Sequence, residues 1–135
     1  MATIKKINHV AIVVRDIEES LRFWEESLGL KLDHIEVVPS QHSRVAFIPV
    51  GDSEVELVQP TSSDSGLAAY LEKRGEGMHH LCVEVDDIDA KLAELKEKGV
   101  RLINQEAEVL PGRKMAFIHP KAGNGVLIEL YQLTN

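Results

Sequence analysis

The chain has 135 residues, a mass of 15.0 kDa and a net charge of −7, so we expect one domain, residues 1–135, with a real core. The acidic balance argues against nucleic-acid binding, and no apolar run approaches the ~20 residues of a membrane span. The single cysteine, Cys82, excludes an intramolecular disulfide and a cysteine-cluster metal site.

The first ten residues have no features of a secretory or transit peptide. We therefore expect a cytoplasmic protein, although a processed organelle protein would look the same.

The first half of the chain predicts one strand, one helix and three further strands. Residues 7–14 are apolar and rich in β-branched side chains, as in a strand. Asp16 and Glu19 have the spacing of a capping box, an apolar stripe follows, and Gly29 is placed to end the helix. The three strands are expected at about 30–38, 43–50 and 54–59.

The second half repeats this order after a turn-rich joint that contains a short helix near 67–71. A strand over 78–85 is followed by a helix that begins at Asp87 and ends at Gly99. Further strands are expected at about 100–108, 114–119 and 126–132.

The two halves also match residue by residue. His9 and His80 are 71 positions apart, the AFI of 46–48 recurs 70 positions later, and VELVQ at 55–59 recurs as IELYQ at 128–132. A nearly constant shift indicates two copies of one unit, at about 5–60 and 77–133. We therefore predict an α+β fold in which two tandem βαβββ modules form a curved mixed sheet around a cavity.

Each copy has a histidine early in its first strand and a glutamate in its last strand. A strand side chain projects to one face only, so neighbouring first and last strands would point both groups into one cavity. The two copies together supply His9, Glu56, His80 and Glu129. Two imidazoles and two carboxylates suit a divalent ion such as Co²⁺, Mn²⁺, Ni²⁺, Fe²⁺ or Zn²⁺.

Taken alone, a histidine or glutamate in a strand is more often structural. The metal prediction therefore depends on the equivalence of the two pairs under the repeat. His79, the neighbour of His80, lies on the opposite face of its strand and has no counterpart in the first copy. His34 and His42 lie in a more polar part of the first copy and are expected at the surface.

The paired units resemble the vicinal-oxygen-chelate superfamily, whose members have a glyoxalase-like fold. Within it, four stretches are similar to the methylmalonyl-CoA epimerase family. They are INHVAIVV at 7–14, DSGLAAYL at 64–71, GEGMHHLCVEVDDIDA at 75–90, and AFIHPK with VLIEL within 116–130.

The resemblance implies a metal-dependent epimerase that interconverts (R)- and (S)-methylmalonyl-CoA through a metal-stabilised enolate. It carries the family's metal ligands onto His9, Glu56, His80 and Glu129. Two alternatives stay open: a lactoylglutathione lyase of the glyoxalase I type, and a non-enzymatic small-molecule-binding module of the same fold. Retention of all four ligand residues counts against the binding module.

Epimerisation requires removal of an α-proton and its return on the other face, which two bases achieve most simply. Glu129 and Glu56, related by the repeat, are the expected acid–base pair. Some epimerases have glutamine at position 56 and a second, non-ligand glutamate in the preceding strand. That position aligns with Ala46, so the second base is left open.

The expected partner is a small-molecule CoA thioester, whose phosphates need cations. The basic or imidazole side chains considered for this role are Arg113, Lys114, His119 and Lys121. The resemblance also favours a homodimer formed through the surfaces of the first strand and helix.

Overall fold

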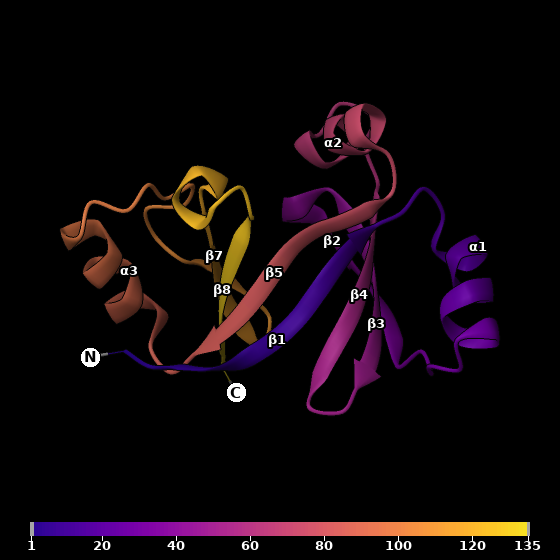
Figure 1. Ribbon diagram of the computed structural model, residues 1–135, viewed down its shortest axis with the longest axis horizontal. Coiled ribbons are helices and arrows are strands. Elements are labelled where there is room, and N and C mark those ends of the chain that lie inside the picture. The colour runs from indigo at the N-terminus through magenta and orange to yellow at the C-terminus, as the bar shows by residue number, and fades with distance from the viewer. Residues whose placement is uncertain (1, 135) are drawn as a thin grey trace. The chain divides into compact units, whose positions relative to one another are not determined.

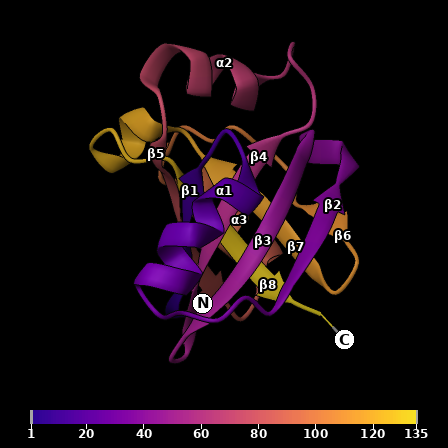
Figure 2. The same cartoon turned by 90° about the vertical axis from the view of Figure 1, so that its right-hand side faces the viewer.

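The computed structural model describes residues 2–134, which separate into two compact units. We call residues 9–79 the N-terminal unit, and residues 2–8 together with 80–134 the C-terminal unit. Each unit contains the predicted strand, helix and three further strands. Figures 1 and 2 together label these elements.

The sheet of the N-terminal unit has the strand order β2-β3-β4-β1. Its strand β1 (Ile4–Val13) enters the unit at His9 and runs parallel to β4 (Ser53–Pro60). The other pairings are antiparallel and involve β2 (His34–Val38) and β3 (Ser43–Val50). The remaining elements are α1 (Ile17–Leu21), its π-helical continuation η1 (Arg22–Ser27), the 3-10 turn η2 (Pro39–Gln41) and α2 (Gly66–Arg74).

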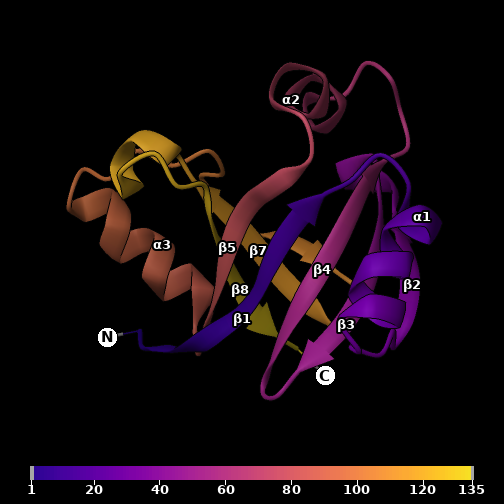
Figure 3. The ribbon, with the colours of Figure 1, turned by 45° about the vertical axis from the view of Figure 1, so that its right-hand side comes forward.

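Helix α1 begins where the capping pattern predicts it. The Asp16 side chain accepts the Glu19 N–H at 3.2 Å, and Gln59 Oε1 on β4 accepts the Ile17 N–H at 2.9 Å. The helix lies against β4, as Figures 2 and 3 show. Its buried cluster contains Val14, Ile17, Ala46, Ile48 and Leu57.

The C-terminal unit has the order β5-β8-β7-β6, with β5 parallel to β8 and the other pairs antiparallel. Its elements are β5 (Gly77–Val85), which enters the unit at His80, α3 (Ile88–Glu97), β6 (Glu108–Leu110), β7 (Arg113–Ile118), the 3-10 turn η3 (Pro120–Gly123) and β8 (Ile128–Leu133). The start of β1 joins this unit, where Asn8 Nδ2 donates to Glu84 Oε1 at 3.0 Å.

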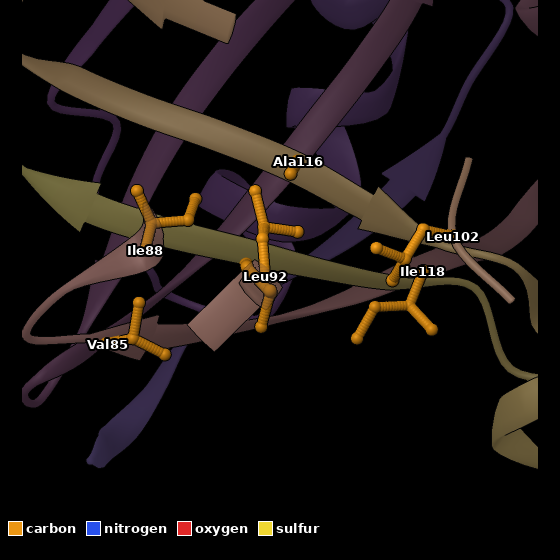
Figure 4. Close-up of a cluster of buried hydrophobic side chains, with 7 residues drawn as sticks. Val85, Ile88, Leu92, Leu102, Ala116 and Ile118 are labelled. Carbon is orange, nitrogen blue, oxygen red and sulfur yellow. The ribbon is translucent and has the colours of Figure 1, made fainter. Parts of the chain in front are cut away.

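Helix α3 repeats the construction of α1. Asp87 accepts the Ala90 N–H at 3.0 Å, and Gln132 Oε1 on β8 accepts the Ile88 N–H at 2.8 Å. The helix packs on β7 and β8 over a second apolar cluster. Figure 4 shows that cluster, which contains Val85, Ile88, Leu92, Leu102, Ala116, Ile118 and Leu130.

Two of the predicted strands are much shorter than expected. Residues 100–108 form only a bridge between Leu102 and Ile118 before β6 starts at Glu108. The Asn104 side-chain oxygen accepts the Phe117 N–H at 2.7 Å, so this N–H is not available for a strand ladder. Similarly, β2 starts at His34 rather than at residue 30, because Glu25 Oε2 accepts the Leu32 N–H at 2.8 Å. In the part of the chain that the structure describes, no helix is long and apolar enough to cross a membrane.

Candidate metal centre and acid–base residues

The N-terminal unit brings its predicted histidine and glutamate together. His9 on β1 and Glu56 on β4 are both buried, with exposed fractions of 1 % and 6 %. His9 Nδ1 lies 3.0 Å from Glu56 Oε2. Glu54 and Ala11 are the register partners of His9 and Glu56, so all four side chains share one face of the sheet. That face is opposite the cluster under α1.

One oxygen of the Glu56 carboxylate lacks a hydrogen-bond donor among the described residues. Among the described residues, the Glu56 Oε2 atom is buried and receives no hydrogen bond, although His9 Nδ1 lies 3.0 Å away. A buried carboxylate oxygen without a donor costs free energy unless a cation neutralises it. A divalent ion beside His9 and Glu56 would neutralise the buried carboxylate, so this pair fits a metal.

The C-terminal unit contains the equivalent pair. His80 Nε2 on β5 lies 2.9 Å from Glu129 Oε1 on β8, and both side chains are at most 9 % exposed. Cys82 and Phe117 are the register partners of Glu129 on the two neighbouring strands. The Phe117 ring meets the His80 ring edge-on, with centroids 5.3 Å apart. Each copy of the repeat therefore holds one imidazole and one carboxylate within contact distance.

The four residues considered for CoA binding do not gather at one place. Arg113 and Lys114 lie at the start of β7, whereas His119 and Lys121 follow its end, about 20 Å away along the strand. Lys114 Nζ is paired with Asp89 of α3 at 2.9 Å.

His119 has a local structural role at the start of η3. Its Nδ1 accepts the Lys121 N–H at 3.1 Å. Desolvation lowers the pKa of the His119 imidazole, and the positive charges of Arg101 and Lys121 lower it further.

Sequence reasoning missed the acidic and imidazole groups that accompany Glu56. Glu54 lies two residues before Glu56 on the same face, and burial raises the pKa of its carboxyl, with a further contribution from the Glu56 charge. His34 was expected at the surface and is half exposed, but its ring stacks on Phe47. Because alternate side chains on a strand share a face, Glu54 could have been predicted from Glu56. The face on which His34 lies follows only from the pairing of β2 with β3.

The structure gives the other two histidines separate places. His79 meets the ring of Tyr70 from α2 edge-on, at a centroid distance of 4.7 Å. His42 ends η2 in the left-handed region, with φ of 50°.

Ala46 cannot mark the place of a missing base. It is fully buried in the cluster under α1, and its register partner is Leu57. The β3 residue opposite Glu56 is Phe47. Because neighbouring side chains on a strand point to opposite faces, Ala46 points away from Glu56. A carboxylate at position 46 would lie in an apolar core, away from His9 and Glu56.

Comparison with known proteins gives a consistent family. The sequence profile of the Glyoxalase/Bleomycin resistance protein/Dioxygenase superfamily matches residues 8–117. The mitochondrial methylmalonyl-CoA epimerase of Mus musculus is 38 % identical over 129 residues, which covers 94 % of this chain and 72 % of the mouse protein. An ethylmalonyl-CoA/methylmalonyl-CoA epimerase of Cereibacter sphaeroides is 36 % identical over 133 residues, covering 96 % of this chain and 99 % of that protein.

A solved structure is also similar to this chain. It is a single-residue variant of the methylmalonyl-CoA epimerase of Streptomyces coelicolor in complex with 2-nitronate-propionyl-CoA. It superposes with a TM-score of 0.91 at 31 % identity, and the match covers 98 % of this chain and all of that chain. The glyoxalase-like fold implied by the family resemblance is confirmed.

Proposed function

Since the chain belongs to the Glyoxalase/Bleomycin resistance protein/Dioxygenase superfamily, we propose that it is a methylmalonyl-CoA epimerase, which interconverts the (R)- and (S)-epimers of methylmalonyl-CoA. The observation that carries the proposal is similarity over nearly the whole chain to proteins with that name. The buried histidine–glutamate pair in each unit supports it.

Proteins of this superfamily typically bind a divalent metal ion. We propose that His9, Glu56, His80 and Glu129 hold one ion per chain, and that Co²⁺, Mn²⁺, Ni²⁺ or Zn²⁺ suits this set of nitrogen and oxygen donors. When bound, the ion supplies a Lewis acid that stabilises negative charge developing on a substrate oxygen.

The protein's own contribution is proton transfer at the carbon between the thioester and the carboxylate. Glu129 is the proposed base for one face of that carbon, because its carboxylate is buried and held beside His80. The ring of Phe117 and the thiol-bearing side chain of Cys82 flank it on the same face and limit access of water. Glu56, its repeat equivalent, is the sequence-based choice for the other face.

The test is epimerisation of each purified methylmalonyl-CoA epimer in D₂O by the metal-loaded wild type and by Glu129→Gln. We expect the wild type to interconvert both epimers and to introduce deuterium at the α-carbon. Glu129→Gln should lower the epimerisation rate by about 10²–10⁴-fold, the usual contribution of a general acid–base group, and should abolish deuterium exchange in at least one epimer.

Two results would contradict the proposal. A wild type that is inactive on both epimers removes the epimerase assignment. Retention of exchange in both epimers by Glu129→Gln removes Glu129 as a base while keeping that assignment. An assay with the glutathione hemithioacetal of methylglyoxal serves as the control for lyase activity.

A further inference from the structure

An aspartate–histidine pair stands at the start of β2. His34 Nδ1 lies 2.6 Å from Asp33 Oδ2, and the two side chains are 53 % and 61 % exposed. The His34 ring stacks on Phe47, with centroids 4.4 Å apart and an interplanar angle of 8°. A carboxylate that holds Nδ1–H fixes the ring and its tautomer, so Nε2 becomes the basic atom.

The pair lies on the same face of the sheet as Glu56. His34 is the register partner of Phe47 on β3, and Phe47 is the register partner of Glu56 on β4. Register partners share a face, so the three residues form one row across neighbouring strands; Figure 2 shows β2 beside β3. The two outer backbones of the row are about 10 Å apart, since neighbouring strands are about 4.8 Å apart.

The second copy of the repeat is an internal comparison. Asp33 and Ile103 both donate their backbone N–H to the carbonyl of the equivalent phenylalanine, at 2.8 and 2.9 Å. The next residue is His34 in one copy and Asn104 in the other. The side-chain oxygen of Asn104 accepts the Phe117 N–H. The second copy therefore forms the same backbone hydrogen bond without an imidazole or a carboxylate at these two positions. The aspartate–histidine pair is an addition specific to the N-terminal unit.

The neighbouring strand β3 supplies no acid–base group on this face. Its side chains there are Ser43, Val45, Phe47 and Pro49, because Ala46 and Ile48 point into the cluster under α1. Glu56 and Glu129 would each have to leave the metal to accept a proton, whereas His34 is outside the proposed ligand set and is free to take up a proton while the metal stays bound. The charged groups that face His34 are Asp33, Glu54 on β4 and Glu36 on its own strand.

We propose that His34, oriented by Asp33, is the second acid–base residue and serves the face of the α-carbon that Glu129 does not. This inference rests on the proposed epimerase function and assigns its second base to His34 instead of Glu56. In one direction the C–H bond breaks, its electron pair enters the enolate, and the proton moves to His34 Nε2. Glu129, which starts as the neutral carboxylic acid, then delivers its proton to the opposite face, so that the cycle ends with an imidazolium and a carboxylate. In the other direction the Glu129 carboxylate removes the α-proton and the imidazolium returns its proton to carbon.

The decisive variant is His34→Asn, which copies the residue of the other repeat. We expect at least a 100-fold fall in kcat for epimerisation with KM changed less than threefold. In D₂O, deuterium exchange should persist in the epimer whose proton faces Glu129 and should be lost in the other. Glu129→Gln should give the reverse pattern. A purely structural role of His34 would lower exchange in both epimers together.

Chemical rescue provides a second measurement. Because the His34 side chain is more than half exposed, added imidazole should restore activity at least tenfold to His34→Ala and none to Glu129→Gln. His42→Asn is the control, since His42 ends η2 and has no role in the proposed reaction. Its activity should equal that of the wild type.

The outcomes separate the two proposals. Wild-type activity with an unimpaired His34→Asn overturns the role of His34 and leaves the epimerase proposal intact. Loss of exchange in both epimers without rescue by imidazole also overturns it. The complementary loss pattern in Glu56→Gln instead of His34→Asn assigns the second base to Glu56. An inactive wild type overturns the epimerase proposal and this inference with it.

Discussion

At the scale of single residues, two buried glutamates show how the same side chain can serve different purposes. Glu84 Oε1 accepts a hydrogen bond from Asn8, and its Oε2 lies 3.6 Å from Lys5 Nζ, so its charge is compensated within the fold. Glu56 is equally buried, but its Oε2 receives no hydrogen bond from the described residues. Removal of the charge should therefore have opposite effects at the two positions.

We expect Glu56→Gln to raise the free energy of unfolding of the metal-free protein by about 1 kcal/mol, because it relieves an uncompensated buried charge. Glu84→Gln is the matched control and should lower it by about 1 kcal/mol. Urea unfolding in the presence of a chelator measures both. Equal destabilisation by the two variants would show that the metal-free fold compensates Glu56 as well as Glu84.

The sequence predicted the two histidine–glutamate pairs because the repeat is visible without any structure. A constant shift identifies His80 from His9, and Glu129 from Glu56. It could not identify His34, because the face of that residue depends on the length of the turn between β2 and β3. It also could not place Ala46 in the buried cluster under α1, since a position taken from an alignment carries no information about the face of the strand.

At the scale of elements, strand and helix limits were predictable where local chemistry alone decides them. The expected strand at 43–50 agrees with β3 to the residue, and both helices begin after their predicted aspartate caps. The expected strand at 100–108 failed because the Asn104 amide competes with the ladder, a tertiary contact that apolar content does not reveal.

The attachment of α1 to the sheet gives a prediction about acid stability. Arg44 on β3 binds Glu18 on α1 through both terminal nitrogens, at 2.9 and 2.6 Å. The hydrogen bonds from Arg44 lower the pKa of Glu18 from 4.5 to about 2. A lowered pKa in the folded state means that the pair stabilises the protein above pH 4.5 and loses its effect as the pH falls towards 2.

Glu18→Gln should therefore lower the Tm slightly at neutral pH, since exposed ion pairs are weak, and the difference from the wild type should vanish towards pH 2. Thermal unfolding between pH 2 and pH 7 measures it. Glu26→Gln, an exposed position on η1, is the control and should show no such convergence. A constant difference at all pH values would exclude the ion pair as its cause.

At the scale of the whole molecule, the duplication divides the donors equally. Strand β1 contributes its first residues to the C-terminal unit and His9 onwards to the N-terminal unit, while β5 changes units at His80. Each proposed histidine ligand is thus the first residue of its strand within its own unit. Each unit supplies two donors, which is half of a tetrahedral ligand set or one third of an octahedral one.

The proposed four-residue ligand set predicts a stoichiometry of one divalent ion per chain. Co²⁺ at a hundred times its Kd should raise the free energy of unfolding by about 2.7 kcal/mol, and a chelator should remove this gain. His9→Ala and His80→Ala should each abolish the gain, and the double variant should lose no more than either alone, because all four donors serve one ion. Calorimetric titration of the metal-free protein measures the stoichiometry, and thermal unfolding measures the gain. Two equivalents of Co²⁺, of which each single variant loses one, would show that the two histidine–glutamate pairs bind ions separately.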